Sequence, residues 1–369
     1  MTYSPLGQHS THMKKTRINE IDLLRFFAAI AVVLFHYAFR GHAYDDLSVM
    51  SYPWLIPIAK YGYLGVHLFF MISGFVIFMS AMNTNLRSFA ASRAARLYPA
   101  FWACCTITFL AILLIDDPRF TAQLPQYLIN MSMLSDFISS APIDGAYWSI
   151  FIEIRFYLLV AIVLLLRQMH NAEYIMFAWL IYAAKIAIFG GSGHLSTYLV
   201  AEYAALFIAG ASFYMVWSKG VSTLRTATIA SSSLLAIYQA LKQAQVLTGV
   251  FKSEVSPIIV VSVIVCFFIV MAISATRKTG AIGRKNWSAI GALTYPLYLL
   301  HQVVGYLLFN LMFDKVNIHL LFWGVILVML LLSYAINRFV EKPLSSRLRM
   351  ALDPRRTIQP DTRHEKTAN

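Results

Sequence analysis

The chain has 369 residues, of which 59% are hydrophobic and only 13% are charged, and its formal net charge is +13. Soluble globular proteins carry charge at about a quarter of their positions, so this composition excludes an ordinary soluble domain. The basic residues stand in short blocks between long apolar runs, which is typical of membrane topology and not of nucleic-acid binding. The three cysteines show no CxxC or other metal-ligand spacing, which argues against disulfides and against a metal site.

Long apolar runs recur along almost the whole chain and predict an all-α polytopic membrane bundle of about ten transmembrane helices. The predicted spans are, in chain order, 20–39, 62–81, 98–115, 148–166, 173–190, 198–217, 223–241, 256–275, 293–312 and 318–337. The first span is not followed by a small-residue cleavage site, so we interpret it as retained. The seventh is the weakest, because it is rich in the small and polar residues that favour helix–helix contacts.

The distribution of basic residues predicts that both termini are cytoplasmic. With ten spans, 21 of the 30 Lys and Arg residues fall on the side of the termini, 6 on the opposite side and 3 within spans. This asymmetry follows the preference of positive charge for the cytoplasmic side. The predicted organisation is an N-terminal cytoplasmic segment (1–19), a transmembrane domain (20–340) and a basic cytoplasmic tail (341–369). The longest outer loops are 40–61 and 116–147.

The first span carries Arg25 and His36, two ionisable residues in an otherwise apolar helix. Eleven residues separate them, so at about 100° per residue they differ by only about 20° in direction and lie roughly 16 Å apart along the axis. Taken alone, Arg25 also fits a residue that reaches the headgroups, and His36 fits a polar helix contact. Their shared face favours a common functional site at two depths in the membrane.

Two further groups carry candidate chemistry. Arg93 and Arg96 fit either ordinary cytoplasmic charge or a guanidinium pair that binds the phosphates of an acyl-CoA, and we expect them in a loop that leads into the third span. Glu153 lies inside the fourth span and needs a partner there. We expect that partner to be His36, at a similar depth in the outer half, although a structural ion pair fits as well.

Several sequence motifs occur in a fixed order along the membrane region. They are DLLRFFAAIAVVLFHY (22–37), GVHLFFMISGFVI (65–77), SRAARLYP (92–99), YWSIFIEIRFY (147–157), TYPLYLLH (294–301) and VEKP (340–343). Together they resemble the acyltransferase-3 family of membrane enzymes, which acylate carbohydrates of the bacterial envelope. Two positions depart from the family pattern: His67 replaces a common aspartate, and Thr294 replaces a common serine.

This resemblance implies a multi-pass O-acyltransferase of the bacterial inner membrane with acetyl-CoA as donor. The implied acceptor is a carbohydrate, namely an envelope or extracellular polysaccharide that is free or lipid-linked. It implies no metal and no nucleic acid. We expect His36 to act as general base or transient acyl carrier, together with Glu153 and Arg25. Substrate binding is assigned to six residues: Arg93, Arg96, Ser73, Trp148, Tyr295 and His301. Close helix packing is an alternative explanation for Ser73 and aromatic packing for Tyr295.

The competing interpretation is a transporter or flippase of lipid-linked saccharides that uses intramembrane charges as a gate. Transporters of this kind are commonly built from paired repeats with broken helices. The sequence shows no such repeat, and we therefore favour the acyltransferase.

Overall fold

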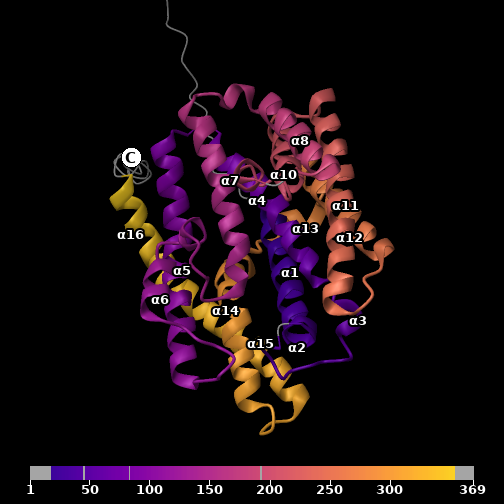
Figure 1. The fold of residues 1–369 in the computed structure, drawn as a ribbon. Helices are drawn as coiled ribbons and strands as arrows, with labels where there is room; N and C mark the ends of the chain where they lie inside the picture. The colour runs from indigo at the N-terminus through magenta and orange to yellow at the C-terminus, as the bar shows by residue number, and fades with distance from the viewer. Residues whose placement is uncertain (1–17, 45, 83, 192, 354–369) are drawn as a thin grey trace, which may run out of the picture.

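The computed structural model describes residues 18–44, 46–82, 84–191 and 193–353. Throughout these residues the structure is helical, and they contain no β-strand (Figure 1). Eight helical segments are long and apolar enough to cross a membrane. The prediction of an all-α polytopic membrane bundle is thereby confirmed. The number of ten spans and the cytoplasmic position of both termini stay predictions.

Ten long helices follow the ten predicted spans in chain order. They are α1 (Asn19–Phe35), α4 (Gly65–Ala81), α5 (Leu86–Ile115), α7 (Trp148–Leu165), α8 (Ala172–Phe189), α10 (Ala204–Lys219), α11 (Thr223–Phe251), α12 (Pro257–Ala275), α14 (Ser288–Met312) and α15 (Ile318–Ile336). Of these, α10 and α11 are not among the eight candidate membrane spans, and α10 has only 16 residues.

Short helices and two π-helical segments lie between and beside the long helices. The short α-helices are α2 (Gly41–Ala43), α3 (Ile56–Ala59), α6 (Leu124–Asn130), α9 (His194–Tyr198) and α13 (Gly280–Arg284), and the 3-10 helices are η2 (Gly62–Leu64), η3 (Ser135–Ile138), η4 (Gly145–Tyr147) and η5 (Met169–Asn171). The π-helical segments are η1 (His36–Arg40), which continues α1, and η6 (Asn337–Glu341), which joins α15 to α16 (Lys342–Leu352). Because π-helical turns are rare and often mark functional sites, the start of η1 at His36 directs attention to that residue.

The third long helix begins earlier than predicted. The side chain of Asn85 accepts a hydrogen bond from the backbone N–H of Ser88 (2.9 Å) and caps the N-terminus of α5. Helix α5 therefore extends from Leu86 through the whole predicted span. The placement of Arg93 and Arg96 in a loop is wrong, because both lie on this helix, where their spacing of three puts them on neighbouring turns.

Helices α4 and α10 approach each other closely through two glycines. A Cβ atom on Gly74 would lie 2.1 Å from the backbone oxygen of Phe207, and one on Gly210 would lie 1.8 Å from the backbone oxygen of Met71. Only glycine fits at such distances, so the helices pack backbone to backbone, as small residues allow in membrane bundles. This contact fixes the position of α4, which carries Ser73 next to Gly74.

Helix α1 and its π-helical continuation are held against α14. The hydroxyl of Tyr37 donates a hydrogen bond to the backbone oxygen of His301 (2.7 Å), and the hydroxyl of Tyr306 donates one to the backbone oxygen of His36 (3.4 Å). Tyr37 and Tyr306 are completely buried. Buried hydroxyls that are paired in this way stabilise one register between two helices, and this register brings His36 next to His301.

The loop before α7 folds back into the bundle. Asp144 is fully buried, and its carboxylate accepts hydrogen bonds from the backbone N–H groups of Ala146 (2.8 Å) and Val303 (3.0 Å). Val303 lies well inside α14, so α7 begins at Trp148 already deep in the bundle. Glu153, five residues further on, consequently lies roughly 8 Å deeper than the start of the helix.

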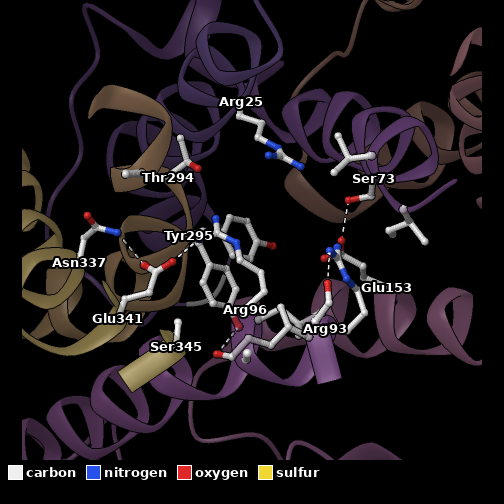
Figure 2. A pocket seen from close by; sticks show the side chains of 18 of the residues that line it. Arg25, Ser73, Arg93, Arg96, Glu153, Thr294, Tyr295, Asn337, Glu341 and Ser345 are labelled. Carbon is white, nitrogen blue, oxygen red and sulfur yellow. Dashed lines mark hydrogen bonds and ion pairs between the residues drawn. The ribbon is translucent and has the colours of Figure 1, made fainter. Parts of the chain in front are cut away.

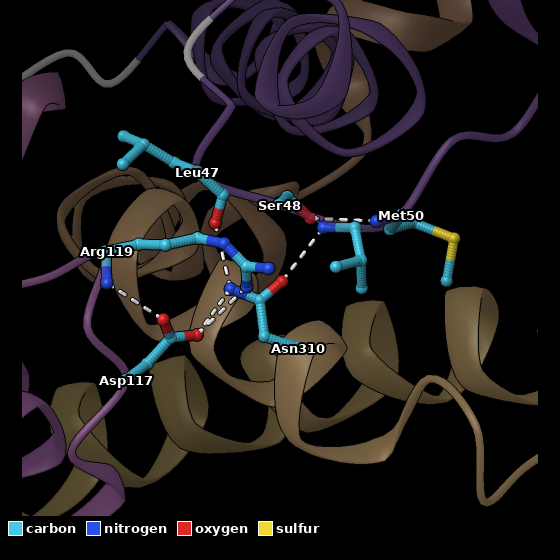
Figure 3. A network of polar contacts seen from close by, with 7 residues as sticks. Leu47, Ser48, Met50, Asp117, Arg119 and Asn310 are labelled. Atoms are coloured by element: carbon cyan, nitrogen blue, oxygen red, sulfur yellow. Dashed lines mark hydrogen bonds and ion pairs between the residues drawn. The ribbon is translucent and has the colours of Figure 1, made fainter.

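The two loops predicted on the outer side, 40–61 and 116–147, are both attached to the end of α14 (Figure 3). The amide nitrogen of Asn310 donates to the backbone oxygen of Leu47 (2.9 Å) and to the carboxylate of Asp117 (2.8 Å), and its amide oxygen accepts from the N–H of Val49 (2.9 Å). Arg119 forms an ion pair with the same Asp117 (3.2 Å). One asparagine thus joins both loops, and we call this end of the bundle the loop end.

The beginning of the predicted tail is structured. Residues 342–352 form α16, which lies along α5 (Figure 1). The backbone oxygen of Leu352 accepts a hydrogen bond from Nε of Arg87 (3.1 Å), and the carboxylate of Asp353 accepts one from the hydroxyl of Ser88 (2.5 Å). The N-terminal segment up to residue 17 and the tail after residue 353 lie outside the described residues, and the division into 1–19, 20–340 and 341–369 stays a prediction.

Candidate active site

A polar cavity of about 1160 Å³ lies between α1, α4, α5, α7, α14 and α16 (Figure 2). Its lining extends from Arg349 of α16 at one end to Val66, Ser149 and Tyr298 towards the loop end. Its size exceeds that of most small-ligand pockets, so it has room for a nucleotide-sized molecule. Most of the residues that the sequence selected meet here, namely Arg25, Ser73, Arg93, Arg96, Glu153 and Tyr295.

Glu153 is held on one wall of the cavity by two hydroxyl groups. Ser73 Oγ donates to its Oε1 at 2.6 Å, and the hydroxyl of Tyr157 donates to the same oxygen at 2.9 Å. Arg25 projects into the cavity from α1 (Figure 2). Both hydrogen bonds come from hydroxyl groups on α4 and α7, so they fix the orientation of the Glu153 side chain in the cavity.

The second carboxylate of the cavity is paired with an arginine. Arg96 forms an ion pair with Glu341, which also accepts a hydrogen bond from the side-chain nitrogen of Asn337 (3.0 Å). Glu341 is only 3% exposed. The guanidinium of Arg96 lies 5.6 Å from the ring centre of Tyr295, where a cation–π contact adds to the attraction. The ion pair connects α5 to η6 and thereby sets the start of α16.

Arg93, unlike Arg96, forms no ion pair with another described residue. Its terminal nitrogen donates to Ser92 Oγ (3.0 Å), and its guanidinium lies 5.9 Å from the ring centre of Tyr157. Its buried Nε atom has no hydrogen-bond partner among the described residues. Because a buried N–H without a partner is costly, this atom is poised to bind an acceptor from a ligand.

His36 does not line the cavity but forms a buried pair with His301 of α14. Nδ1 of His36 lies 2.9 Å from the backbone oxygen of Val32 and 3.2 Å from Nε2 of His301, and Nδ1 of His301 lies 2.8 Å from the backbone oxygen of Tyr298. The ring centres are 4.8 Å apart and nearly perpendicular. His36 is 6% exposed and His301 is fully buried.

These contacts determine the tautomers of the neutral pair. A carbonyl oxygen only accepts hydrogen bonds, so Nδ1 of His301 carries its hydrogen and Nε2 of the same ring is an acceptor. Nδ1 of His36 faces two acceptors and therefore carries the hydrogen of that ring. Nε2 of His36 is left with a free lone pair, and it has no hydrogen-bond partner among the residues that the structure describes. A lone pair fixed in this way is suited to act as base or nucleophile.

Tyr298 stands between the cavity and the histidine pair. Its ring belongs to the cavity lining, and its ring centre is 5.5 Å from that of His301 and 5.8 Å from that of Phe69. Its hydroxyl is hydrogen-bonded to Ser149 Oγ (2.7 Å). The cavity therefore ends one side chain away from His301, whose ring contacts that of His36.

Two expectations from the sequence are not met by this arrangement. The pairing of Glu153 with His36 is not formed, because the inward start of α7 places Glu153 at the level of Ser73 and Arg25 and leaves His301 beside His36. Trp148 does not reach the cavity. It is 36% exposed and contacts the rings of Phe70 and Tyr203 at 6.2 and 5.8 Å.

Sequence reasoning missed several residues of the site, above all Glu341, Asn337, Tyr157 and Tyr298. The signal for Tyr157 was its position four residues after Glu153, one helical turn away on the same face. Glu341 lay in the quoted VEKP motif, but it was read as the start of a tail. Asp144 was missed as well, and its signal was an aspartate directly before the short 3-10 helix Gly145–Tyr147, a position that is typical of an N-cap.

Comparison with known proteins gives a family. The acyltransferase domain family, Acyl_transf_3, matches residues 18–338. The match includes the cavity residues from Arg25 to Asn337, and Glu341 and the residues of α16 follow it. The chain belongs to this family. No solved structure gives a significant match to it.

Three relatives of the acyltransferase illustrate the range of the match. Nodulation protein 10 of Rhizobium leguminosarum bv. viciae is 27% identical over 180 residues, which cover 43% of this chain and 47% of the relative. The O-acetyl transferase of Shigella phage Sf6 is 29% identical over 160 residues (39% and 45%). The O-acetyltransferase OatA of Staphylococcus aureus is 30% identical over 162 residues (39% and 24%). The matched region thus spans less than half the length of these relatives.

The described residues contain no group of three or more His, Cys, Asp or Glu side chains that could hold a metal ion.

The ion pair between Arg96 and Glu341 gives a prediction on stability. Arg96→Ala leaves the carboxylate of Glu341 almost buried without its cation. Since the arginine side chain is 39% exposed, we expect a loss of about 1–2 kcal/mol in the free energy of unfolding. Glu341→Gln in the same background removes the uncompensated charge and should restore part of that loss. Unfolding of the purified protein in detergent measures both; an additive double variant contradicts the coupling.

Proposed function

We propose that this protein is a membrane O-acyltransferase that moves an acyl group, most simply acetyl, from acetyl-CoA to a hydroxyl group of an envelope or extracellular polysaccharide. The observation that carries the proposal is the cavity with Arg25, Arg93 and Arg96 in its lining, which ends at Tyr298. The ring of Tyr298 contacts His301, and His301 is the hydrogen-bond partner of His36, the histidine with a free lone pair. Family membership supports the same reaction class, and two of the relatives are named as O-acetyl transferases.

The arginines of the cavity supply the donor site. The guanidinium of Arg93 has a free buried N–H, and Arg25 and Arg96 add positive charge on facing walls. Guanidinium groups bind phosphates through paired hydrogen bonds, so we place the nucleotide end of acetyl-CoA here. The thin pantetheine arm then extends past Ser73 and Glu153 towards Tyr298, which has to swing aside for the thioester to reach His36.

His36 is the residue that performs the chemistry in this proposal. Nε2 takes the proton from the acceptor hydroxyl while the hydroxyl oxygen attacks the thioester carbonyl, and the C–S bond breaks as the thiolate of CoA leaves and is protonated. In the relay variant, Nε2 itself attacks the carbonyl and later passes the acyl group to the hydroxyl. Both routes need the same unprotonated nitrogen, which the hydrogen bonds of the ring leave free.

His301 is better explained as a positioning residue than as the substrate-binding residue expected from the sequence. Its Nε2 accepts the hydrogen of His36 Nδ1, and its own Nδ1 is fixed by Tyr298. This resembles the way in which an acceptor group orients a catalytic imidazole and stabilises its protonated form.

The predicted topology gives the reaction a direction. With α16 on the cytoplasmic side, the donor site faces the compartment that makes acetyl-CoA, and the histidine pair lies nearer the outer leaflet of the inner membrane. The competing transporter function is distinguished by one assay. Purified protein is incubated with radiolabelled acetyl-CoA and candidate glycans, and label in the glycan supports acyl transfer, whereas translocation without label supports a transporter.

His36→Ala is expected to abolish acyl transfer, because it removes the imidazole nitrogen that the proposal uses as base or nucleophile. The matched control is His42→Ala, which removes an exposed histidine close by on the same chain segment. Label transfer to the glycan measures activity, and gel filtration in detergent checks folding. An active His36→Ala variant rules out both catalytic roles of this residue.

Arg93→Ala is expected to weaken acetyl-CoA binding by about tenfold or more, because it removes a charge-assisted contact to a phosphate. Lys278→Ala, which removes a positive charge from an exposed position outside the cavity, should bind as the wild type does. Calorimetric titration of the purified variants with acetyl-CoA measures the difference. Equal affinities for wild type and Arg93→Ala would take this arginine out of the donor site.

The role of His301 is tested with two replacements. His301→Gln keeps an acceptor oxygen near the position of Nε2, whereas His301→Leu keeps only the bulk. We expect His301→Leu to lower kcat by about 10–100-fold at unchanged KM for acetyl-CoA and to shift the midpoint of the pH–rate profile, with His301→Gln much less affected. A raised KM with unchanged kcat in both variants would instead support the substrate-binding role.

A further inference from the structure

Helix α16 turns a polar face towards the cavity. Most of its lining residues are spaced three, four and seven positions apart, as one face of a helix requires: Lys342, Ser345, Ser346 and Arg349, with Met350 beside them and Asp353 directly after the helix. A helix that packs on protein for stability alone normally buries apolar side chains. Here the inward face carries hydroxyl and cationic groups, which are costly to cover unless they bind something.

Two observations indicate that this face lacks a ligand. The hydroxyl oxygen of Ser345 is buried and has no hydrogen-bond partner among the described residues (Figure 2). Lys342 and Arg349 form no ion pair with another described residue, although both line the cavity. The nearby carboxylates are occupied, since Glu341 pairs with Arg96 and Asp353 accepts from Ser88.

The position of this face is fixed at both ends of the helix. At its start, Glu341 is bound to Arg96 of α5, and at its end Leu352 and Asp353 are bound to Arg87 and Ser88 at the beginning of the same helix. Three attachments to one rigid helix hold the inward residues of α16 in place over the cavity. A preorganised set of donors loses little entropy on binding a ligand.

We infer that the inward face of α16, with Arg349, Lys342 and Ser345, is a phosphate subsite that binds the phosphomonoester on the nucleotide end of the acyl-CoA donor. The inference rests on the proposed function. If the acyl end of the donor lies at Tyr298, the nucleotide lies at the opposite end of the cavity, where α16 is. Two cations and a free hydroxyl are suited to a phosphate with two negative charges.

The test compares CoA with dephospho-CoA, which lacks only the phosphomonoester, on the full-length protein in nanodiscs of phosphatidylcholine. The wild type should prefer CoA. Arg349→Ala should bind CoA about tenfold or more weakly and dephospho-CoA as the wild type does, and Ser345→Ala should show a smaller change of the same kind. Arg347→Ala, on the exposed face of the same helix, is the matched control and should leave both affinities unchanged.

Each contrary result has a separate meaning. If Arg349→Ala and Arg347→Ala behave alike, or if Arg349→Ala weakens both ligands equally, the phosphate subsite is overturned while the donor site stands. A wild type that binds neither ligand contradicts the proposed function itself. If the effect of Arg349→Ala on CoA binding is seen only in nanodiscs with phosphatidylglycerol, α16 binds lipid headgroups, which also overturns the inference.

Discussion

Every ionisable side chain inside this bundle has to find a partner, because the lipid around it offers none. A charge in hydrocarbon costs several kcal/mol, and the bundle lowers that cost by placing Arg25, Arg96, Glu153 and Glu341 in one cavity. Glu153 is held by Ser73 and Tyr157, and Glu341 is held by Arg96 and Asn337. The close packing of α4 on α10 and the attachment of α16 to α5 are what keep those partners within reach.

The fold and part of the site could be predicted because they follow from one-dimensional patterns. Apolar runs long enough to cross a bilayer predicted the helices. The eleven-residue spacing of Arg25 and His36 predicted one shared site, but only Arg25 lines the cavity, and His36 is buried beside His301 at the point where α1 changes to a π-helical segment. Residues that are polar inside apolar runs, such as Ser73, Glu153 and Tyr295, did gather in the cavity.

What could not be predicted depends on contacts between distant segments. Hydropathy locates the apolar run around residue 150 but says nothing of its depth, which is set by the hydrogen bond of Asp144 to a backbone N–H inside α14. Because α7 lies at this depth, Glu153 is not beside His36, and the partner of His36 is His301, 265 residues away in sequence. Likewise, the composition of residues 342–352 is that of a solvated tail, and only the contacts of α5 show that it is a wall of the cavity.

The replacement of a carboxylate by a second imidazole has a chemical consequence. An ionised carboxylate beside His36 would stabilise the imidazolium strongly and keep the ring protonated for longer, whereas a neutral imidazole acceptor fixes the tautomer with a weaker pull on the proton. In the proposed mechanism, the base takes a proton from the acceptor hydroxyl and releases it to the leaving thiolate, and a weakly held proton suits both steps. Glu153 lies instead in the cavity with the arginines and is not bonded to His36.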